Sequence, residues 1–332
     1  MKNIFAIWLL PALLMGGMEA GCKKSGSAPS KPTWTPGSDI YIVGQDTGRA
    51  VYWKNGVKTV LGQGLGEGIA VSGSDVYVGG VVYKSVGGTV LDLAAYWKDG
   101  VEQLLTDSVT GWAYQPVVAE GDVYVPGYVF GPSPQVYAVY WKNGQRVNLD
   151  PSLESSASGM AIQDTDIYVV GEVWDGGLDT MLVWKDGQRM SGFDGIETDP
   201  MGQILVSGGN IYVAWEQGYY INFGQYVALN TTSQKVGAGS VYLNGSDVYV
   251  TGGYDSATAG FAAYWKNGAI VKLPNYPGTF SSGTAGLVVA GSDVYVAGSI
   301  IMNGRYLGVY WKNGVEDSLS GNGSAYGIVL GN

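Results

Sequence analysis

The sequence predicts an all-β fold, namely a seven-bladed β-propeller built from four-stranded antiparallel blades. Two observations point to this fold: phrases that recur along the chain, and half-units at its two ends that complement each other. The composition agrees, because 54 Gly and 24 Tyr with many Val and Trp favour strands joined by tight turns. After the first 20 residues, no stretch shows the sustained apolar spacing that predicts a helix.

The first recurring phrase joins an aromatic strand to a tight turn. It reads "AVYWKNG" from Ala50, "AAYWKDG" from Ala94 and "GVYWKNG" from Gly308. Asn-Gly and Asp-Gly adopt positive φ at little cost, so each copy is expected to close a β-hairpin. One unit lacks the Trp, and its degenerate copy is predicted to be "YVALNTTSQKV" from Tyr226. The tryptophans of the phrase are Trp53, Trp97, Trp141, Trp184, Trp265 and Trp311.

A second phrase alternates with the first and begins at an Asp or Asn turn. "GSDVYVGG" from Gly73 and "GSDVYVAG" from Gly291 are typical of its seven copies. The acidic residue is interpreted as a turn residue whose carboxylate binds nearby N–H groups, with calcium ligation as the alternative. The copies recur every 36 to 47 residues. Their Asp or Asn residues are Asp39, Asp75, Asp122, Asp166, Asn210, Asp247 and Asp293.

Each unit contains four short β-like runs, and four antiparallel strands repeated seven times predict propeller blades. The repeat region starts at Ser38 with the second strand of a unit and stops after "AYGIVLGN", the first strand of a unit. Residues 325–330 are therefore predicted to pair beside residues 38–44 and to close the ring. A closed ring removes the exposed edges of an open array. The alternative, an open β-solenoid, needs no complementary half-units.

The repeated Trp is interpreted as packing. Alternation along a strand places it on one face of each third strand, where an indole can fill the space between neighbouring blades. The alternative is a ring of indoles that bind a ligand.

The N-terminal residues 1–21 have the features of a secretory signal peptide, because Lys2 precedes a short apolar run that ends in small residues. A membrane span needs about 20 apolar residues, more than this run provides. Ala20, Gly21 and Cys22 resemble the lipobox of bacterial lipoproteins, whose cysteine is lipidated and becomes the mature N-terminus. The resemblance implies a lipid anchor in a bacterial cell envelope, at the outer membrane in a Gram-negative cell. The alternative is an ordinary cleaved signal with an incidental Cys.

Residues 22–37 are rich in Ser, Pro, Gly and Lys and are expected to form a flexible tether after the lipidated Cys22. Residues 38–332 are expected to form the propeller. The anchor would then be the protein's sole link to the membrane.

Charge and residue content exclude several classes of function. The net charge of −10 argues against nucleic acid as a partner, because that affinity depends on Lys and Arg. The chain has no His, so Ser–His and Cys–His nucleophiles and His-ligated zinc are impossible. We expect no cofactor, no metal and a monomer.

The unit "AAYWKNGAIVKLPNYPGTFSSGTAGLVVAGSDVYVAG" resembles the bacterial extracellular HAF-type repeat. In that family an Ala-Phe/Tyr-x-Trp-x-x-Gly strand pair leads through a loop to a strand that ends near a Gly. The resemblance covers residues 38–332. It implies an extracellular β-repeat domain on a bacterial envelope and supplies no catalytic residues.

The two faces of such a disc differ in sequence. The turns of the two phrases lie on one face and are short and nearly invariant. The opposite face, called here the loop-rich face, carries the connections between second and third strands and between units. Function usually lies on variable loops carried by a rigid scaffold. The candidate ligand-binding residues there are Trp112, Tyr114, Trp174, Asp175, Glu197, Asp199, Glu216, Tyr219, Tyr220 and Tyr276.

Exposed aromatic rings beside carboxylates suit sugar rings or the hot spots of a protein partner. The sequence therefore predicts a binding or scaffold module for a glycan or a protein, with no residue assigned as catalytic. The simpler interpretation is that some of these aromatic residues cover the cores of loops. The alternative function is a carboxylate-dependent glycosidase or polysaccharide lyase, with Glu197, Asp199 and Glu216 as candidate acids. A structural role in the envelope is also open.

Overall fold

The structure is a computed structural model that describes residues 38–331. Within that range it leaves out 132–134, 176–177, 192, 194–202, 216–218, 223–224, 230–235, 256–259 and 275–278. The described residues belong to one compact unit, Pro32–Asn332. The predicted signal peptide, Cys22 and the tether lie outside them. In this part of the chain no helix is long and apolar enough to cross a membrane.

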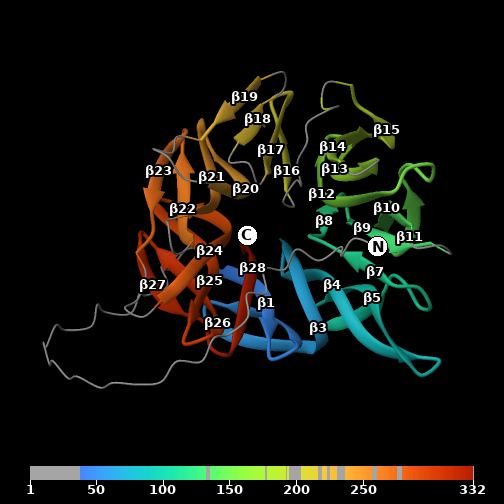
Figure 1. The fold of residues 1–332 in the computed structure, drawn as a ribbon, viewed down its shortest axis with the longest axis horizontal. Helices are drawn as coiled ribbons and strands as arrows, with labels where there is room; N and C mark the ends of the chain where they lie inside the picture. The colour runs from blue at the N-terminus through green and yellow to red at the C-terminus, as the bar shows by residue number, and fades with distance from the viewer. Residues whose placement is uncertain are drawn as a thin grey trace, which may run out of the picture. The chain divides into compact units, whose positions relative to one another are not determined.

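Every regular element among the described residues is a β-strand, and successive sheets follow one another around a common centre (Figure 1). The first sheet is antiparallel and has seven strands. In pairing order they are β28 (Gly323–Leu330), β1 (Ile40–Asp46), β2 (Arg49–Lys54), β3 (Val57–Ser72), β4 (Asp75–Val86), β5 (Thr89–Lys98) and β6 (Val101–Leu104).

This first sheet is large because β3 pairs with two groups of strands. Its first part lies against β2 and its second part, from Gly64, against β4. Gly62 and Gly64 stand at the change of partner with φ of 149° and 145°, values that glycine adopts readily and other residues avoid. At the other edge of the sheet, β28 pairs with β1 from Ile40↔Leu330 to Asp46↔Gly323.

Five further antiparallel sheets follow in chain order. One has five strands because its inner strand is interrupted at Pro116, which has no N–H to donate to a ladder. Its strands are β7 (Gly111–Ala113), β8 (Val117–Ala119), β9 (Asp122–Phe130), β10 (Val136–Lys142) and β11 (Gln145–Asn148). The other four sheets have four strands each. The first comprises β12 (Ser155–Gln163), β13 (Asp166–Asp175), β14 (Leu178–Lys185) and β15 (Gln188–Arg189), and the second comprises β16 (Ile204–Ser207), β17 (Asn210–Trp215), β18 (Tyr219–Asn222) and β19 (Gln225–Ala228). The third comprises β20 (Val236–Asn244), β21 (Asp247–Asp255), β22 (Gly260–Lys266) and β23 (Ala269–Lys272), and the fourth comprises β24 (Thr279–Ala290), β25 (Asp293–Met302), β26 (Arg305–Lys312) and β27 (Val315–Ser318).

Two sequence predictions are wrong in detail. The degenerate Trp phrase was placed at Tyr226, but Tyr226 lies in β19, the fourth strand of its sheet, and the third strand is β18. Because this unit has neither the Trp nor the Asn-Gly turn, its sequence does not mark where the third strand lies. The stretch "YKSVGGTVLDL" from Tyr83 was expected to be a loop between second and third strands, but the loop is shorter. The strands β4 and β5 extend to a two-residue turn at Gly87 and Gly88, both with positive φ, which suits a tight hairpin.

A repeated set of hydrogen bonds joins the Asp turn and the Asn-Gly turn of a unit, as in the β20–β23 sheet. Asp247 accepts hydrogen bonds from Asn267 Nδ2 at 2.8 Å and from Lys266 Nζ at 2.7 Å. Asn267 Oδ1 accepts from the backbone N–H of Val248 at 2.9 Å, and Lys266 lies 5.4 Å from the Tyr249 ring centroid. The hydrogen bond from Lys266 lowers the pKa of Asp247. The Asp of the second phrase is thus a turn residue, as predicted.

The repeated indoles form the core between neighbouring sheets. All six are buried, with exposed fractions of 2% or less. Trp97 of β5 packs in one cluster with Tyr41, Val43 and Ala50 from the neighbouring β1 and β2. The prediction that the Trp fills the space between blades is therefore confirmed, and the described residues form an all-β propeller with antiparallel blades.

Candidate functional site

A β-bulge recurs on the inner strands of the sheets. The register slips by one residue around Glu67 in β3, Ser158 in β12, Ala285 in β24 and Tyr326 in β28. A bulge leaves its extra residue outside the ladder and re-aims its side chain, and bulges are frequent beside active sites. Glu67, Ser158 and Ala285 each stand eight residues before the Asp of the second phrase. We call this repeated place the bulge position.

Side chains at the bulge position differ sharply from unit to unit. Tyr326, Glu67 and Tyr114 occupy it in three successive units. In other units it holds Ser158, Ala285 or, in β20, Gly239. A scaffold made of equivalent blades needs no such asymmetry, so the large and acidic side chains mark a candidate site on one side of the propeller.

Aromatic side chains gather beside the bulge position in the β7–β11 sheet. Trp112 and Tyr128 are directly opposed on β7 and β9, with ring centroids 6.4 Å apart and an interplanar angle of 13°. Tyr114 lies 6.4 Å from the same Tyr128 ring, and Phe130 meets it edge-on at 6.0 Å. All four side chains keep part of their surface exposed. Because Phe130 ends β9 and Trp112 lies in the first residues of β7, these rings lie toward the loop-rich face.

Carboxylates stand beside these rings. Burial raises the pKa of Glu67 to about 7, against the opposing effect of a hydrogen bond from Trp112. Burial also raises the pKa of Asp92 in β5. Glu172 of β13 accepts a hydrogen bond from Ser156 Oγ at 3.2 Å.

The charges of these carboxylates act on the same nearby phenols. The pKa of Tyr128 is raised by burial and then by the charges of Glu67, Asp92 and Glu172. The pKa of Tyr114 is raised by burial, by Tyr128 and by the charges of Glu67 and Glu172. Burial and the charge of Glu67 also raise the pKa of Tyr326. The pKa of Tyr83 is raised by burial and by the charges of Asp92 and Glu67. The aromatic–carboxylate cluster comprises Glu67, Tyr83, Asp92, Trp112, Tyr114, Tyr128, Phe130, Glu172 and Tyr326.

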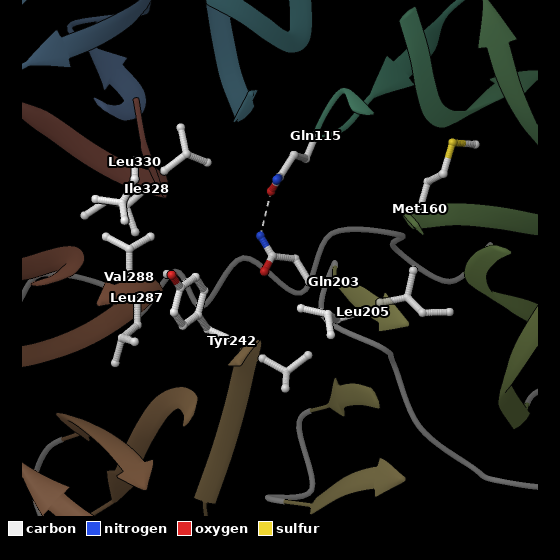
Figure 2. Close-up of a pocket in the computed structure, with 13 residues that line it drawn as sticks. Gln115, Met160, Gln203, Leu205, Tyr242, Leu287, Val288, Ile328 and Leu330 are labelled. Atoms are coloured by element: carbon white, nitrogen blue, oxygen red, sulfur yellow. Dashed lines mark hydrogen bonds between the residues drawn. The ribbon is translucent and has the colours of Figure 1, made fainter. Parts of the chain in front are cut away.

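A cavity of about 330 Å³ lies among the inner strands, and its lining includes none of the cluster residues. Gln115, the neighbour of Tyr114, lines it and accepts a hydrogen bond from Gln203 Nε2 at 2.6 Å. Figure 2 shows the two amides pointing toward each other, with apolar side chains such as Leu287 and Val288 along one wall. The cavity has the size of a small-molecule site, and its polar groups are few.

The structure brings together two of the residues predicted from the sequence, Trp112 and Tyr114. Trp174 is half-buried at the end of β13, two residues after Glu172. Tyr219, Tyr220 and Asp175 were expected in loops but lie in strands, because the flanking hairpins extend further than their turn residues suggested. The side chains of these three, and the whole of Glu197, Asp199, Glu216 and Tyr276, lie outside the described residues.

Sequence reasoning missed Glu67, Tyr128 and Glu172. Glu67 and Glu172 were not singled out because both lie within strands and not in loops. The signal that could have found Glu67 is the comparison of equivalent positions among the units, where it is the acidic residue among Tyr, Ser, Gly and Ala. Among the described residues, no group of three or more Cys, Asp or Glu is placed to hold a metal ion.

Glu67→Gln is expected to change the pH dependence of stability. Because the folded protein raises the pKa of Glu67 from 4.5 to about 7, it holds this proton more tightly than the unfolded chain does. The stabilisation is complete below about pH 4.5 and is lost as pH rises through 7. At pH 8 the wild type should therefore be less stable than the variant by about 1–3 kcal/mol, with the difference shrinking toward pH 4.5. Urea unfolding from pH 5 to 8 measures it, with exposed Asp107→Asn as control; a pH-independent difference contradicts it.

No family model matches the sequence, and no curated protein matches it. The structure is similar to a puromycin-hydrolyzing peptidase from Mycobacterium tuberculosis, with a TM-score of 0.54 and 14% identity over 87% of this chain and 52% of that chain. It is similar to TolB from Acinetobacter baumannii, with a TM-score of 0.51 and 12% identity over 87% and 82% of the two chains. It is also similar to the WD40 β-propeller domain of Doa1, with a TM-score of 0.48 and 16% identity over 78% of this chain and 86% of that chain. At these identities the likeness concerns the fold alone.

Proposed function

We propose that this protein is a binding module that recognises a glycan through the aromatic–carboxylate cluster on its loop-rich face. The observation that carries the proposal is the placement of the parallel Trp112 and Tyr128 rings beside Glu67. Partly exposed aromatic faces suit the apolar faces of sugar rings, and carboxylates accept hydrogen bonds from sugar hydroxyls. A protein ligand is the other possible occupant of this face.

The proposed scaffold is a ring of seven blades that the C-terminal strand closes. The antiparallel pairing of β28 with β1 supports closure, because it joins the two ends of the repeat region in one sheet. The division of β3 between two groups of partners supports the count of seven blades. Each half of β3 belongs to a different set of four paired strands. A rigid ring would hold the cluster residues of neighbouring blades in fixed positions, which favours binding over a passive structural role.

A carboxylate-dependent hydrolase is a second candidate, favoured by one observation. A glutamate with a pKa of about 7 keeps its proton near neutral pH and can act as a general acid. Glu172, which shares influence over Tyr114 and Tyr128, is the described carboxylate that could serve as its base. Shortened glycan products accumulating during a binding experiment would identify this activity, and intact ligand after prolonged incubation would eliminate it.

Trp112→Ala is expected to weaken glycan binding by about five- to thirtyfold, because a stacked indole contributes on the order of 1–2 kcal/mol. The experiment is a glycan-array screen of residues 38–332, followed by titration of the best ligand. Tyr254→Ala is the matched control, since Tyr254 pairs with Phe261 at 5.6 Å in a different sheet. Equal losses in the two variants, or no loss for Trp112→Ala, would refute a glycan site at this cluster.

The proposed location is a bacterial cell envelope, with the protein secreted and held by a lipid on Cys22. The lipobox-like Ala20-Gly21-Cys22 and the HAF-like repeats support this. Expression in a Gram-negative host should give a mature chain that begins at a lipidated Cys22. Mass spectrometry of the N-terminus tests it, and either an unmodified Cys22 or cleavage elsewhere contradicts it.

A further inference from the structure

The residue that follows the bulge position, called here the inner position, is usually glycine. Neighbouring units approach closely there: a Cβ on Gly68 would lie 2.3 Å from Gln115 Cα, and a Cβ on Gly286 would lie 3.0 Å from Ile328 Cγ2. Glycine in a strand often marks such a close approach, so the scaffold favours it at this place. The residues at the inner position are Gly68, Gln115, Gly159, Gln203, Ser240, Gly286 and Gly327.

Two units carry a long side chain at the inner position, and these side chains meet. Gln115 belongs to the sheet of β7–β11 and Gln203 directly precedes β16, so their sheets are not consecutive along the chain. Gln203 Nε2 nevertheless donates a hydrogen bond to Gln115 Oε1 at 2.6 Å. The unit between them has Gly159 at the inner position, which provides no side chain to separate the two amides. Equivalent blades do not require this pair, so it marks a place where the protein differs from its own repeat.

The amide pair borders the cavity of about 330 Å³. Of the described residues that line this cavity, none is Asp, Glu, Lys or Arg. The polar side-chain groups of the lining are the two amides and the hydroxyl of Tyr242, while Leu287 and Val288 form part of an apolar wall (Figure 2). A charged ligand would lose its hydration here without meeting an opposite charge, so the cavity favours an uncharged ligand.

The hydrogen bond between the amides leaves one donor and one acceptor. In the described part of the chain the two side chains hydrogen-bond with each other, which uses Gln203 Nε2 and Gln115 Oε1. A side-chain amide has both a carbonyl oxygen and an NH₂ group, so Gln115 Nε2 and Gln203 Oε1 remain available to a ligand. Figure 2 shows Gln203 Oε1 turned away from Gln115. One C=O and one N–H on the ligand would satisfy both atoms.

We propose that this cavity binds a compact, uncharged molecule that carries an amide group on an apolar body. The ligand C=O accepts from Gln115 Nε2, its N–H donates to Gln203 Oε1, and its apolar body lies against Leu287 and Val288. The cavity volume is near the lower end for small-molecule sites, which limits the ligand to a compact one. The lining includes no residue of the aromatic–carboxylate cluster, so this inference does not rest on the proposed glycan binding.

N-cyclohexylacetamide and cyclohexyl acetate test the amide requirement, because the ester replaces the N–H by an oxygen and hardly changes the shape. Calorimetric titration at pH 7 should show the amide binding at least about fivefold tighter, since the ester leaves Gln203 Oε1 unpaired. Cyclohexylamine, which is a cation at this pH, should bind more weakly than either probe. Equal affinities of the amide and the ester, tightest binding of the cation, or no binding of the amide would each overturn the proposal.

Variants locate the binding in this cavity. Gln203→Leu removes the acceptor at similar size, so the two neutral probes should bind it equally. Gln103→Leu, at an exposed position in β6, is the matched control and should keep the preference for the amide. Leu205→Trp places a larger side chain at the half-buried wall of the cavity and should abolish binding of both probes while both amides remain. Circular dichroism confirms that each variant is folded. A preference for the amide that survives in Gln203→Leu, or binding that survives in Leu205→Trp, refutes this site.

Discussion

Trp97→Ala is expected to lower the free energy of unfolding by about 3–5 kcal/mol, as truncation of other buried tryptophans does. The indole is 0% exposed and packs between the β1–β2 part and the β4–β5 part of the first sheet. Its removal leaves a cavity lined by Tyr41, Val43 and Ala50, which belong to strands held by their own ladders and cannot collapse into the space. The loss should appear as a lower midpoint in urea unfolding.

Two phenylalanine substitutions separate packing from hydrogen bonding. Trp97 Nε1 has no hydrogen-bond partner, whereas Trp53 Nε1 donates to Ser320 O at 3.1 Å. Trp97→Phe should therefore cost less than Trp53→Phe, by about 1 kcal/mol for the lost hydrogen bond. Tyr306→Ala, at a position that is 47% exposed, should change stability by less than about 0.5 kcal/mol. If Trp97→Ala left the midpoint unchanged but abolished ligand binding, the repeated indole would be a recognition element.

The scaffold could be predicted from the sequence because its signals are local and repeated. The turn residues, the alternating strands and the Trp each depend on neighbours in their own unit, and repetition removed chance matches. The unit around Tyr226 was misassigned for the same reason, since it lacks those markers. Its third strand, β18, is held by pairing with β17, which sequence alone does not show.

The candidate site was only partly predictable because it is made between units. Trp112 and Tyr114 were found as aromatic residues near a connection, but Tyr128 joins them through the register of β7 with β9. Glu67 comes from another sheet, and a bulge directs it. Its pKa depends on burial by that surrounding structure. Contacts of this kind follow from the assembly of the blades, and no short stretch of sequence contains them.

Deletion of residues 323–332 is expected to be the most damaging change, lowering the free energy of unfolding by at least about 5 kcal/mol. The strand β28 supplies Ala325 and Ile328 to the buried cluster around Trp53, so its loss removes core packing as well as backbone hydrogen bonds. The deletion also leaves the β1 edge unpaired and open to association with other chains.

Circular dichroism melts and light scattering of the truncated protein measure both effects. The melting temperature should fall by at least about 10 °C, and the truncated protein should self-associate more than the full chain. A synthetic peptide of residues 323–332 should restore much of the loss by strand addition beside β1, because the edge it leaves offers the complementary register. A peptide with Ile328→Asp keeps the backbone donors and acceptors but places a charge in the core, so it should not restore stability. A truncated protein that melts like the full chain would show that β28 contributes nothing to the ring, and the proposed closure would fail with it.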